Sequence, residues 1–121
     1  MSKKFLNKLL PGSIVRYNRR VMSLNRDDIT YLYENPKGCS PIKLEDGVLG
    51  IIGFEYQPVG QYTRSLKTGD VEVHFRDEIE VYIENEHKEI KLTNIKYVHE
   101  LQLAVMSMLD VELKLQLCEA E

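Results

Sequence analysis

The sequence predicts an α+β protein, in which short antiparallel strands are combined with a long apolar C-terminal helix. Apolar and polar residues alternate over 71–92, a 3.6-residue apolar period covers 95–109, and turn-forming residues separate the segments. A chain of 121 residues that is 43% hydrophobic has the length of one domain and can form a core. We therefore expect a single domain over 1–121, in which 1–10 is a flexible or helical N-terminal extension.

The N-terminal part predicts a helix followed by a small meander. One side of the helix is apolar, and Pro11-Gly12 ends it. The segments 14–18, 21–24 and 29–33 are rich in β-forming residues and are separated by two turns. We expect them to form a three-stranded meander resembling an SH3 fold.

The middle of the chain predicts a short helix at about 45–52 and then a second meander. Gly53 is placed to end the helix in a left-handed conformation, with Phe54 packing back on Leu49 or on the turn of Gly50. Strands are expected at 61–66, 71–76, 79–84 and around 90–92, with turns at 67–70, 77–78 and 85–87. The alternation gives this meander one buried face and one acidic, solvent-facing side.

The C-terminal part predicts a helix over 95–109, capped by Thr93 or Asn94, and a strand over 111–117. The helix is apolar on more than one stripe, so it is either sandwiched between two layers or in contact with another subunit. An exposed alternating strand also favours pairing with another chain. The predicted self-association surface consists of Val105, Met106, Leu109, Leu113 and Leu115.

The net charge of −3 conceals a strong asymmetry. Residues 1–43 contain nine bases and three acids, a net charge of +6, whereas 44–121 contain seven bases and sixteen acids, a net charge of −9. Such a division is typical of a polyanion-binding face, of head-to-tail contact between copies, or of two parts that attract each other within one fold. The third arrangement is the commonest.

A basic cluster in the first meander is the strongest indication of a ligand site. The expected turns would bring its residues to one rim, where guanidinium groups suit phosphates and Tyr17 or Tyr31 could stack on a base. The alternative is that the arginines pair with the acidic sheet. The cluster consists of Arg16, Tyr17, Arg19, Arg20 and Arg26.

No catalytic or metal-binding pattern is evident. Cys39 and Cys118 form no CxxC motif, and His74, His87 and His99 lack ligand spacing, so we expect free thiols and surface or capping histidines. The paired carboxylates fall in turns or on exposed strand positions, and the serines and glycines match no nucleophile or phosphate-loop motif. The sequence therefore predicts no enzyme activity, no cofactor and no metal, and it contains no run of about 20 apolar residues that could cross a membrane.

Three segments resemble one protein family. Ile95-Lys-Tyr-Val-His-Glu-Leu-Gln102, with Asp110-Val-Glu-Leu113 after it, is similar to the "YVHQLQNLYFALTGEEL" ending of small uncharacterised proteins of phages and mobile elements of gut bacteria. Pro11-Gly-Ser-Ile-Val-Arg-Tyr-Asn18 resembles that family's "IGNYVYLNG" strand, and Pro41-Ile-Lys-Leu-Glu-Asp46 to Phe54 resembles its "PIPLTEEWLLKFGF" helix. The sequence departs from the family at Leu103–Met108, where the aromatic residues are replaced, and at Asp110.

The resemblance implies a phage or mobile-element accessory protein in a bacterial cytoplasm and transfers no functional residue. Together with the residue patterns, it predicts a non-enzymatic binding protein that acts by protein–protein contact, with a host or phage protein or with its own copies. The alternative is a protein that binds a nucleotide or nucleic acid through the arginine rim and so counteracts a host defence.

Overall fold

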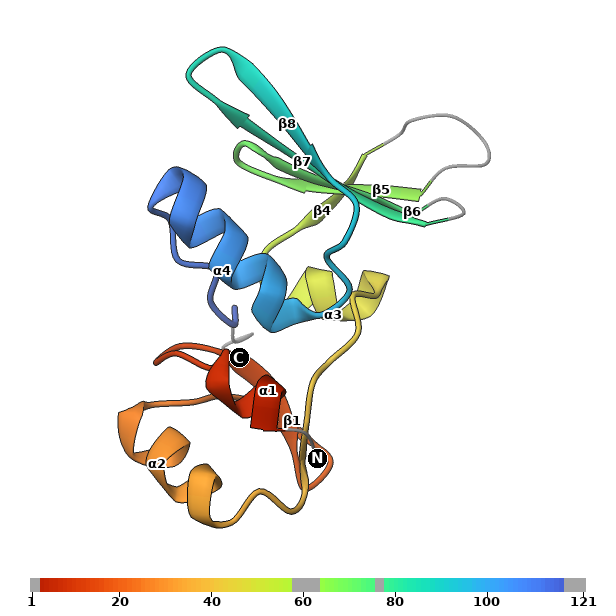
Figure 1. Ribbon diagram of the computed structural model, residues 1–121. Helices are drawn as coiled ribbons and strands as arrows, with labels where there is room; N and C mark the ends of the chain where they lie inside the picture. Colours follow the sequence, from red (N-terminus) through yellow and green to blue (C-terminus); the bar gives the residue numbers. More distant parts are fainter. Residues whose placement is uncertain (1–2, 58–63, 76–77, 117–121) are drawn as a thin grey trace.

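The computed structural model describes residues 3–57, 64–75 and 78–116, and it has an α+β fold with two sheets and four helices (Figure 1). A small sheet of order β2-β1-β3 lies in the N-terminal part, and a five-stranded antiparallel sheet of order β4-β5-β6-β7-β8 follows. The elements are α1 Lys3–Asn7, β1 Ile14–Tyr17, β2 Arg20–Ser23, α2 Arg26–Glu34, β3 Cys39–Ser40, α3 Asp46–Ile51, β4 Glu55–Gln57, β5 Arg64–Thr68, β6 Val71–Phe75, β7 Ile79–Asn85, β8 Lys88–Leu92 and α4 Val98–Leu109.

Helix α4 lies between the two sheets, as Figure 1 shows, and it contacts both β1 and β7. Of the two alternatives for its wide apolar surface, the sandwich is therefore confirmed. The main core joins α4 and α3 to one face of the five-stranded sheet, and its central side chains include Leu49, Val73, Val81 and Leu101. A fully buried core of this kind is held by the hydrophobic effect, at about 1.5–3 kcal/mol for each large aliphatic side chain.

Strand β1 separates the main core from a smaller one. Its first residue, Ile14, faces the main core, and the next, Val15, faces the cluster under α1 and α2. Successive side chains of a strand point to opposite faces, so Ile14 and Val15 enter different cores, and each is fully buried there. The N-terminal unit and the large sheet thus share α4 and β1 as a common wall.

The predicted strand at 29–33 is wrong, and with it the SH3-like layout. This segment lies in helix α2, where the side chain of Asn25 accepts a hydrogen bond from the backbone N–H of Asp28 at 2.8 Å. The Asp28 carboxylate accepts one from the N–H of Asn25 at 3.0 Å, which completes a capping box. The third strand of the small sheet is β3, which pairs with β1.

The predicted helix stop at Gly53 is confirmed. Gly53 has a φ of 100°, and its N–H donates to the carbonyl of Gly50 at 3.2 Å. The N–H of Phe54 donates to the carbonyl of Leu49 at 3.0 Å, and both side chains are buried in the same core. These two bonds form the Schellman arrangement.

The meander predicted after residue 60 is present, with changed limits. Strands β6 and β7 agree with the alternating segments, while β5 continues through Thr68, so its turn is shorter than expected. Residues 61–63 of the predicted first strand lie outside the described residues. An additional edge strand, β4, pairs with β5.

The C-terminal predictions need two corrections. Helix α4 begins at Val98, with Tyr97 as the preceding residue, so neither Thr93 nor Asn94 caps it. Residues 111–116 belong to no strand, and residue 117 lies outside the described residues. This segment packs back on the molecule: Leu113 is only 6% exposed, and the N–H of Gln116 donates to the carbonyl of Ile51 at 2.6 Å.

Candidate functional site

A groove runs along α4, on the side that faces the N-terminal segment. His99, Gln102, Leu103 and Met106 line it from the helix, at the i, i+3, i+4 and i+7 positions of one helical face. The opposite wall is formed by Lys8, Leu10, Pro11, Gly12 and Ser13, and the C-terminal segment adds Glu112 and Leu113. This part of the groove is narrow, with a cavity of about 60 Å³.

Gln102 fixes the two walls of the groove to each other. Its Oε1 accepts a hydrogen bond from the N–H of Ile14 at 2.8 Å. Its Nε2 donates to the carbonyl of Gly12 at 2.8 Å and to the carbonyl of Leu113 at 2.9 Å. One buried amide therefore joins α4, the start of β1 and the C-terminal segment, which sequence reasoning did not anticipate.

A wider cleft adjoins the groove at the N-terminal end of α4. The cleft has a volume of about 540 Å³, and His99 and Lys8 line both it and the narrow part. The ring of His99 stacks on Tyr97 with centroids 5.9 Å apart and meets the edge of Phe5 at 5.0 Å. The remaining lining residues are Cys39, Ser40, Pro41 and Glu100.

His99 is buried in the cleft and not at the surface, contrary to the sequence-based expectation. The residue is 4% exposed, and its Nδ1 is shielded from solvent without a hydrogen-bond partner. Burial lowers the pKa of the imidazole, and Lys8 acts in the same direction, while Glu100 opposes them. The ring is therefore uncharged at neutral pH.

Two other ionisable groups of the cleft, Cys39 and Glu100, are held protonated or engaged in contacts. Burial raises the pKa of the Cys39 thiol, so it stays protonated at neutral pH, whereas a nucleophilic cysteine needs a lowered pKa. The Glu100 carboxylate accepts from the N–H groups of Lys96 and Tyr97 at 2.9 and 3.1 Å and lies 3.6 Å from the Lys8 ammonium. A histidine, a cysteine and one engaged carboxylate thus meet in a cleft whose groups are neutral or already paired.

Three exposed apolar residues lie together on the groove. Leu10 is 50% exposed, Leu103 is 39% exposed and Met106 is 38% exposed, and all three line the narrow part. We call these three residues the apolar strip. Exposed apolar residues that are contiguous mark interaction surfaces more often than isolated ones do.

The predicted self-association residues occupy different environments. Met106 belongs to the apolar strip, but Val105 and Leu113 are buried in the main core. Leu109 and Leu115 are partly buried against the same core. The surface as predicted is therefore wrong for Val105 and Leu113, because residues 111–116 fold inward and do not form an exposed strand.

The arginine cluster is divided between the two ends of the β1–β2 hairpin. Arg19 lies in the turn, where Asn18 and Arg19 both have positive φ, and Arg16 and Arg20 lie beside it on the strands. Arg26 begins α2, beyond the opposite end of β2. The single rim is therefore wrong for Arg26, since the helix replaces the expected third strand.

The tyrosines of this region face away from Arg16. Tyr17 packs against the smaller core, on the other face of β1, and lines a hollow of about 190 Å³ together with the exposed Tyr31. Within the described part of the chain, Arg16, Arg19 and Arg20 are exposed and form no ion pair. The expected alternative, pairing with the acidic sheet, is not seen among these residues.

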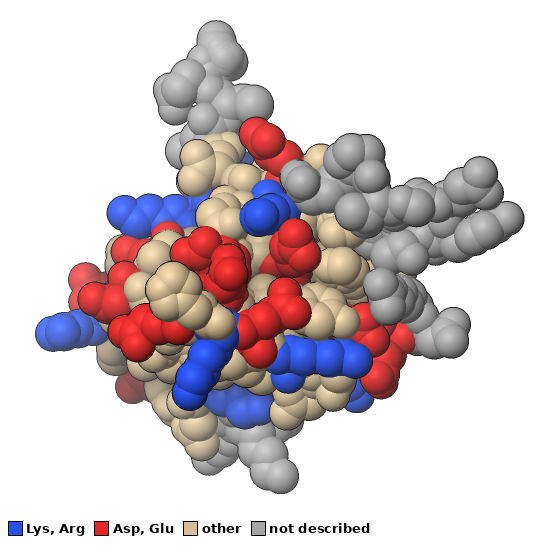
Figure 2. Space-filling view, turned by 90° about the horizontal axis from the view of Figure 1, so that it is seen from above, with Lys and Arg blue, Asp and Glu red and all other residues tan. Residues whose placement is uncertain are grey.

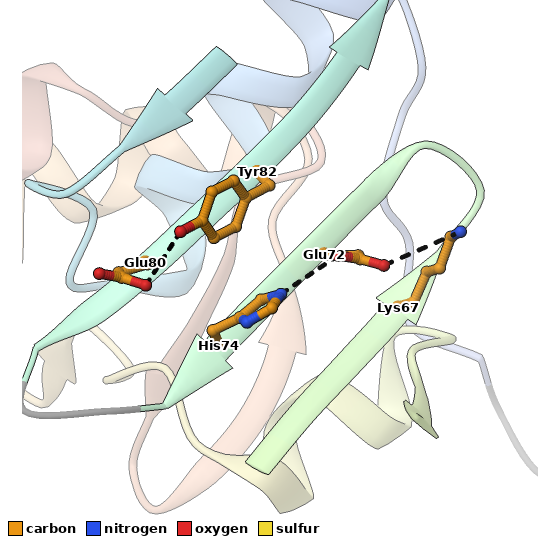
Figure 3. A network of polar contacts seen from close by, with 5 residues as sticks. All are labelled: Lys67, Glu72, His74, Glu80 and Tyr82. Carbon is orange, nitrogen blue, oxygen red and sulfur yellow. Dashed lines mark hydrogen bonds and ion pairs between the residues drawn. The ribbon is translucent and has the colours of Figure 1, made fainter. Parts of the chain in front are cut away.

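The acidic solvent-facing side of the five-stranded sheet lies at the far end of the molecule from the hairpin (Figures 1 and 2). A polar network crosses it (Figure 3): Glu72 contacts Lys67 at 3.9 Å and His74 at 3.1 Å, and the Tyr82 hydroxyl donates to Glu80 at 3.1 Å. Glu80 also lies 3.2 Å from Lys91 and, through a hydrogen bond, raises the pKa of that ammonium. Much of this acidic charge is therefore compensated locally.

Among the described residues, no group of three histidine, cysteine, aspartate or glutamate side chains is arranged to hold a metal ion. No helix in the described ranges has the length and apolar character needed to span a membrane. In comparisons with known proteins, no family model, no curated protein and no solved structure matches the chain.

Proposed function

We propose that the protein is a non-enzymatic binding module that acts by contact with another protein chain, and that this chain is a second copy of itself. The observation that carries the proposal is the apolar strip of Leu10, Leu103 and Met106 on the groove of α4. The raised pKa of the Cys39 thiol supports a binding role over catalysis by a thiolate. An origin in a phage or mobile element and a cytoplasmic location are proposed on the resemblance alone.

The charges beside the strip are compatible with a second copy as the occupant. Lys8 lies 3.6 Å from Glu100 in the first turn of α4, and Glu112, which follows the end of that helix, lies 3.8 Å from Lys114. Lys8 and Glu112 both line the groove, and each already has a partner within its own chain. A two-fold contact would place Lys8 of each copy near Glu112 of the other, so that it would bring charges of opposite sign together.

Light scattering tests this proposal. Leu103→Lys and Met106→Lys place a charge in the strip, and each should weaken self-association by about tenfold or more, as is typical of central interface residues. Ile51→Lys is the matched control, because Ile51 is 40% exposed on α3 and does not line the groove. A wild-type chain that stays monomeric at high concentration, or folded strip variants with unchanged mass, would refute the proposal.

A second proposed function is the binding of single-stranded nucleic acid at the hairpin. It is favoured by the exposure of Arg16, Arg19 and Arg20 and by the absence of ion pairs to them among the described residues. Tyr17 packs against the smaller core, on the other face of β1 from Arg16, so its ring is not placed to stack on a base beside that guanidinium group. Binding there would depend on phosphate contacts.

The salt dependence of binding tests this second function. With an oligothymidine probe, replacing both Arg19 and Arg20 by alanine should reduce the slope of log affinity against log salt by about 1.4, because each phosphate contact on a single strand contributes about 0.7. Lys88→Ala, at the start of β8 in the acidic sheet, should leave the slope unchanged. An equal slope in the wild type and the double variant would exclude the hairpin as the site.

A further inference from the structure

Strand β8 leaves one edge of the five-stranded sheet open. It is the last strand in the order β4-β5-β6-β7-β8, and no described strand pairs with its outer side (Figure 1). Lys88, Glu89 and Lys91 are exposed, and Ile90 and Leu92 are half-buried. An open edge can pair with the backbone of another chain, so its backbone groups and its charges decide which chain fits.

The backbone groups that point outward from β8 belong to Glu89 and Lys91. Glu84 lies opposite Glu89 in the ladder between β7 and β8, but its N–H donates to the carbonyl of Asp70 at 2.9 Å, on the β6 side of β7. Glu84 and Glu89 are therefore a pair that exchanges no hydrogen bonds, and the N–H and carbonyl of Glu89 face away from β7. Because these directions alternate along a strand, the N–H and carbonyl of Lys91 also face outward.

Glu89 lacks a counter-charge within the described part of the chain. Carboxylates directly opposite each other on neighbouring strands repel, and side chains are closest in pairs that exchange no hydrogen bonds, as Glu84 and Glu89 do not. Glu89 forms no ion pair with the described residues. The Lys91 side chain is 48% exposed and lies 3.2 Å from Glu80, and an ammonium group has three donors, so it can also contact a second carboxylate.

One antiparallel register of β8 against the β8 of a second copy satisfies all of these groups. When the Ile90 residues of the two copies face each other on a two-fold axis, Glu89 of each copy lies opposite Lys91 of the other. Both are hydrogen-bonded pairs, because all of their backbone groups face outward, and both unite opposite charges. A shift by two residues in either direction places Glu89 opposite Glu89 or Lys91 opposite Lys91.

We propose that β8 pairs with β8 of a second copy in this register, so that the two five-stranded sheets form one continuous sheet. This contact goes beyond the proposed contact through the apolar strip, since no residue of the strip lies on β8. Lys91 supplies the counter-charge that Glu89 lacks, and the two Ile90 side chains cover each other on the opposite face of the sheet. The charges that ordinarily protect an edge strand from pairing here allow one register and penalise the neighbouring ones.

Hydrogen exchange of the Glu89 and Lys91 amides, followed by NMR at increasing protein concentration, tests the proposal. In a single copy these N–H groups face outward and exchange fast, whereas pairing should slow their exchange by about tenfold or more. Glu89→Lys removes the repulsion from Glu84, so it should not destabilise the chain. It should nevertheless weaken the pairing by about tenfold, because it places two ammonium groups opposite each other. Glu34→Lys, the same change of charge at the exposed end of α2, is the matched control and should have no effect.

A mixture of two variants separates contact between copies from effects within one copy. Lys91→Glu alone places carboxylates opposite each other across the contact, and it also removes the contact with Glu80 in its own chain. When Glu89→Lys chains are mixed with Lys91→Glu chains, each mixed pair again unites opposite charges at both positions, so protection of these amides should return. Glu89→Pro removes an N–H that no bond within the ladder uses, and it should abolish the protection at Lys91 without unfolding the chain.

The proposal is overturned if these amides exchange fast even at millimolar concentration, or if a mixture of the two folded charge variants shows no more protection than either variant alone. Protection that does not depend on concentration would show that the same chain covers the edge, and it would also contradict the proposal. The Leu103→Lys variant should keep the protection. Loss of protection in that variant, together with no effect of Glu89→Lys, would assign the association to the apolar strip and exclude β8.

Discussion

His99 shows how a single residue determines the chemistry of the groove. On the helix it follows Tyr97 by two positions and precedes Gln102 and Met106 on the same face. Sequence spacing gives no sign that the N-terminal segment will cover that face, because the contact joins residues more than 80 positions apart. Burial then lowers the pKa of the ring, so the ring is uncharged at neutral pH.

The lowered pKa of His99 predicts that acid destabilises the fold. The unfolded chain takes up the proton near the ordinary pKa of 6.5, before the folded chain does. The free energy of unfolding should therefore fall as the pH drops below about 6.5, and this contribution should become constant below the pKa of the folded state. Chemical denaturation of the wild type and of His99→Phe at a series of pH values measures the effect.

The variant serves as the control, since all the other ionisable groups are common to both proteins. The difference in stability between the two should depend on pH only in the window below about 6.5. A pH-independent difference would contradict the assignment of His99 as a buried neutral ring.

At the scale of elements, the position of α4 depends on the hydrogen bonds of Gln102. Replacing it by leucine leaves the N–H of Ile14 and the carbonyls of Gly12 and Leu113 without their partner. Each such loss costs about 1–3 kcal/mol when the group is buried, and partial access of water reduces the total, so we expect Gln102→Leu to destabilise the protein by about 2–4 kcal/mol. Gln116→Leu, at an exposed position, should change stability by no more than about 0.5 kcal/mol.

Urea denaturation of the three proteins measures these differences. Equal stability of Gln102→Leu and the wild type would show that the amide does not hold the two walls together. A loss of the same size in Gln116→Leu would place the effect in the C-terminal segment and not in the clamp.

The elements that the sequence predicted are those fixed by local pattern. Alternation over Val71–Phe75 and Ile79–Asn85 identified β6 and β7, and Gly53 identified the end of α3. The segment 29–33 is rich in β-formers, yet the cap at Asn25 starts a helix there, since its side chain supplies a partner for an otherwise unpaired N–H. The hydrogen bond made by the capping residue Asn25 therefore outweighed the β propensity of the segment 29–33.

The C-terminal segment was misassigned for a different reason. Alternation over 111–116 requires only that one side of an extended chain is buried, and Leu113 and Leu115 satisfy that requirement against the main core. A strand also needs a neighbouring backbone for its ladder, which no local pattern supplies. The groove could not be predicted at all, because its walls come from both ends of the chain.

At the scale of the whole molecule, the fold places the basic hairpin and the acidic side of the large sheet at opposite ends, with the apolar strip between them. The hairpin with Arg16, Arg19 and Arg20 lies at the end of the molecule away from the five-stranded sheet, whose outer side is acidic (Figures 1 and 2). The strip lies between them, with Leu103 and Met106 on α4 and Leu10 on the facing wall of the groove. Self-association through the strip would leave both charged regions accessible, so contact through α4 is compatible with nucleic-acid binding at the hairpin.

The most direct test of the central claim is a paramagnetic broadening experiment between copies. Ser107 is exposed on α4 beside Leu103, so a nitroxide attached to Ser107→Cys in a chain that also carries Cys118→Ser lies next to the strip. Cys39 does not compete for the label, because it is buried and its thiol pKa is raised. This chain is mixed with an isotope-labelled copy that carries no nitroxide. The account predicts that the amides of Leu10, Leu103 and Met106 in the isotope-labelled copy are broadened. No broadening at all, or broadening only on the five-stranded sheet, would contradict it.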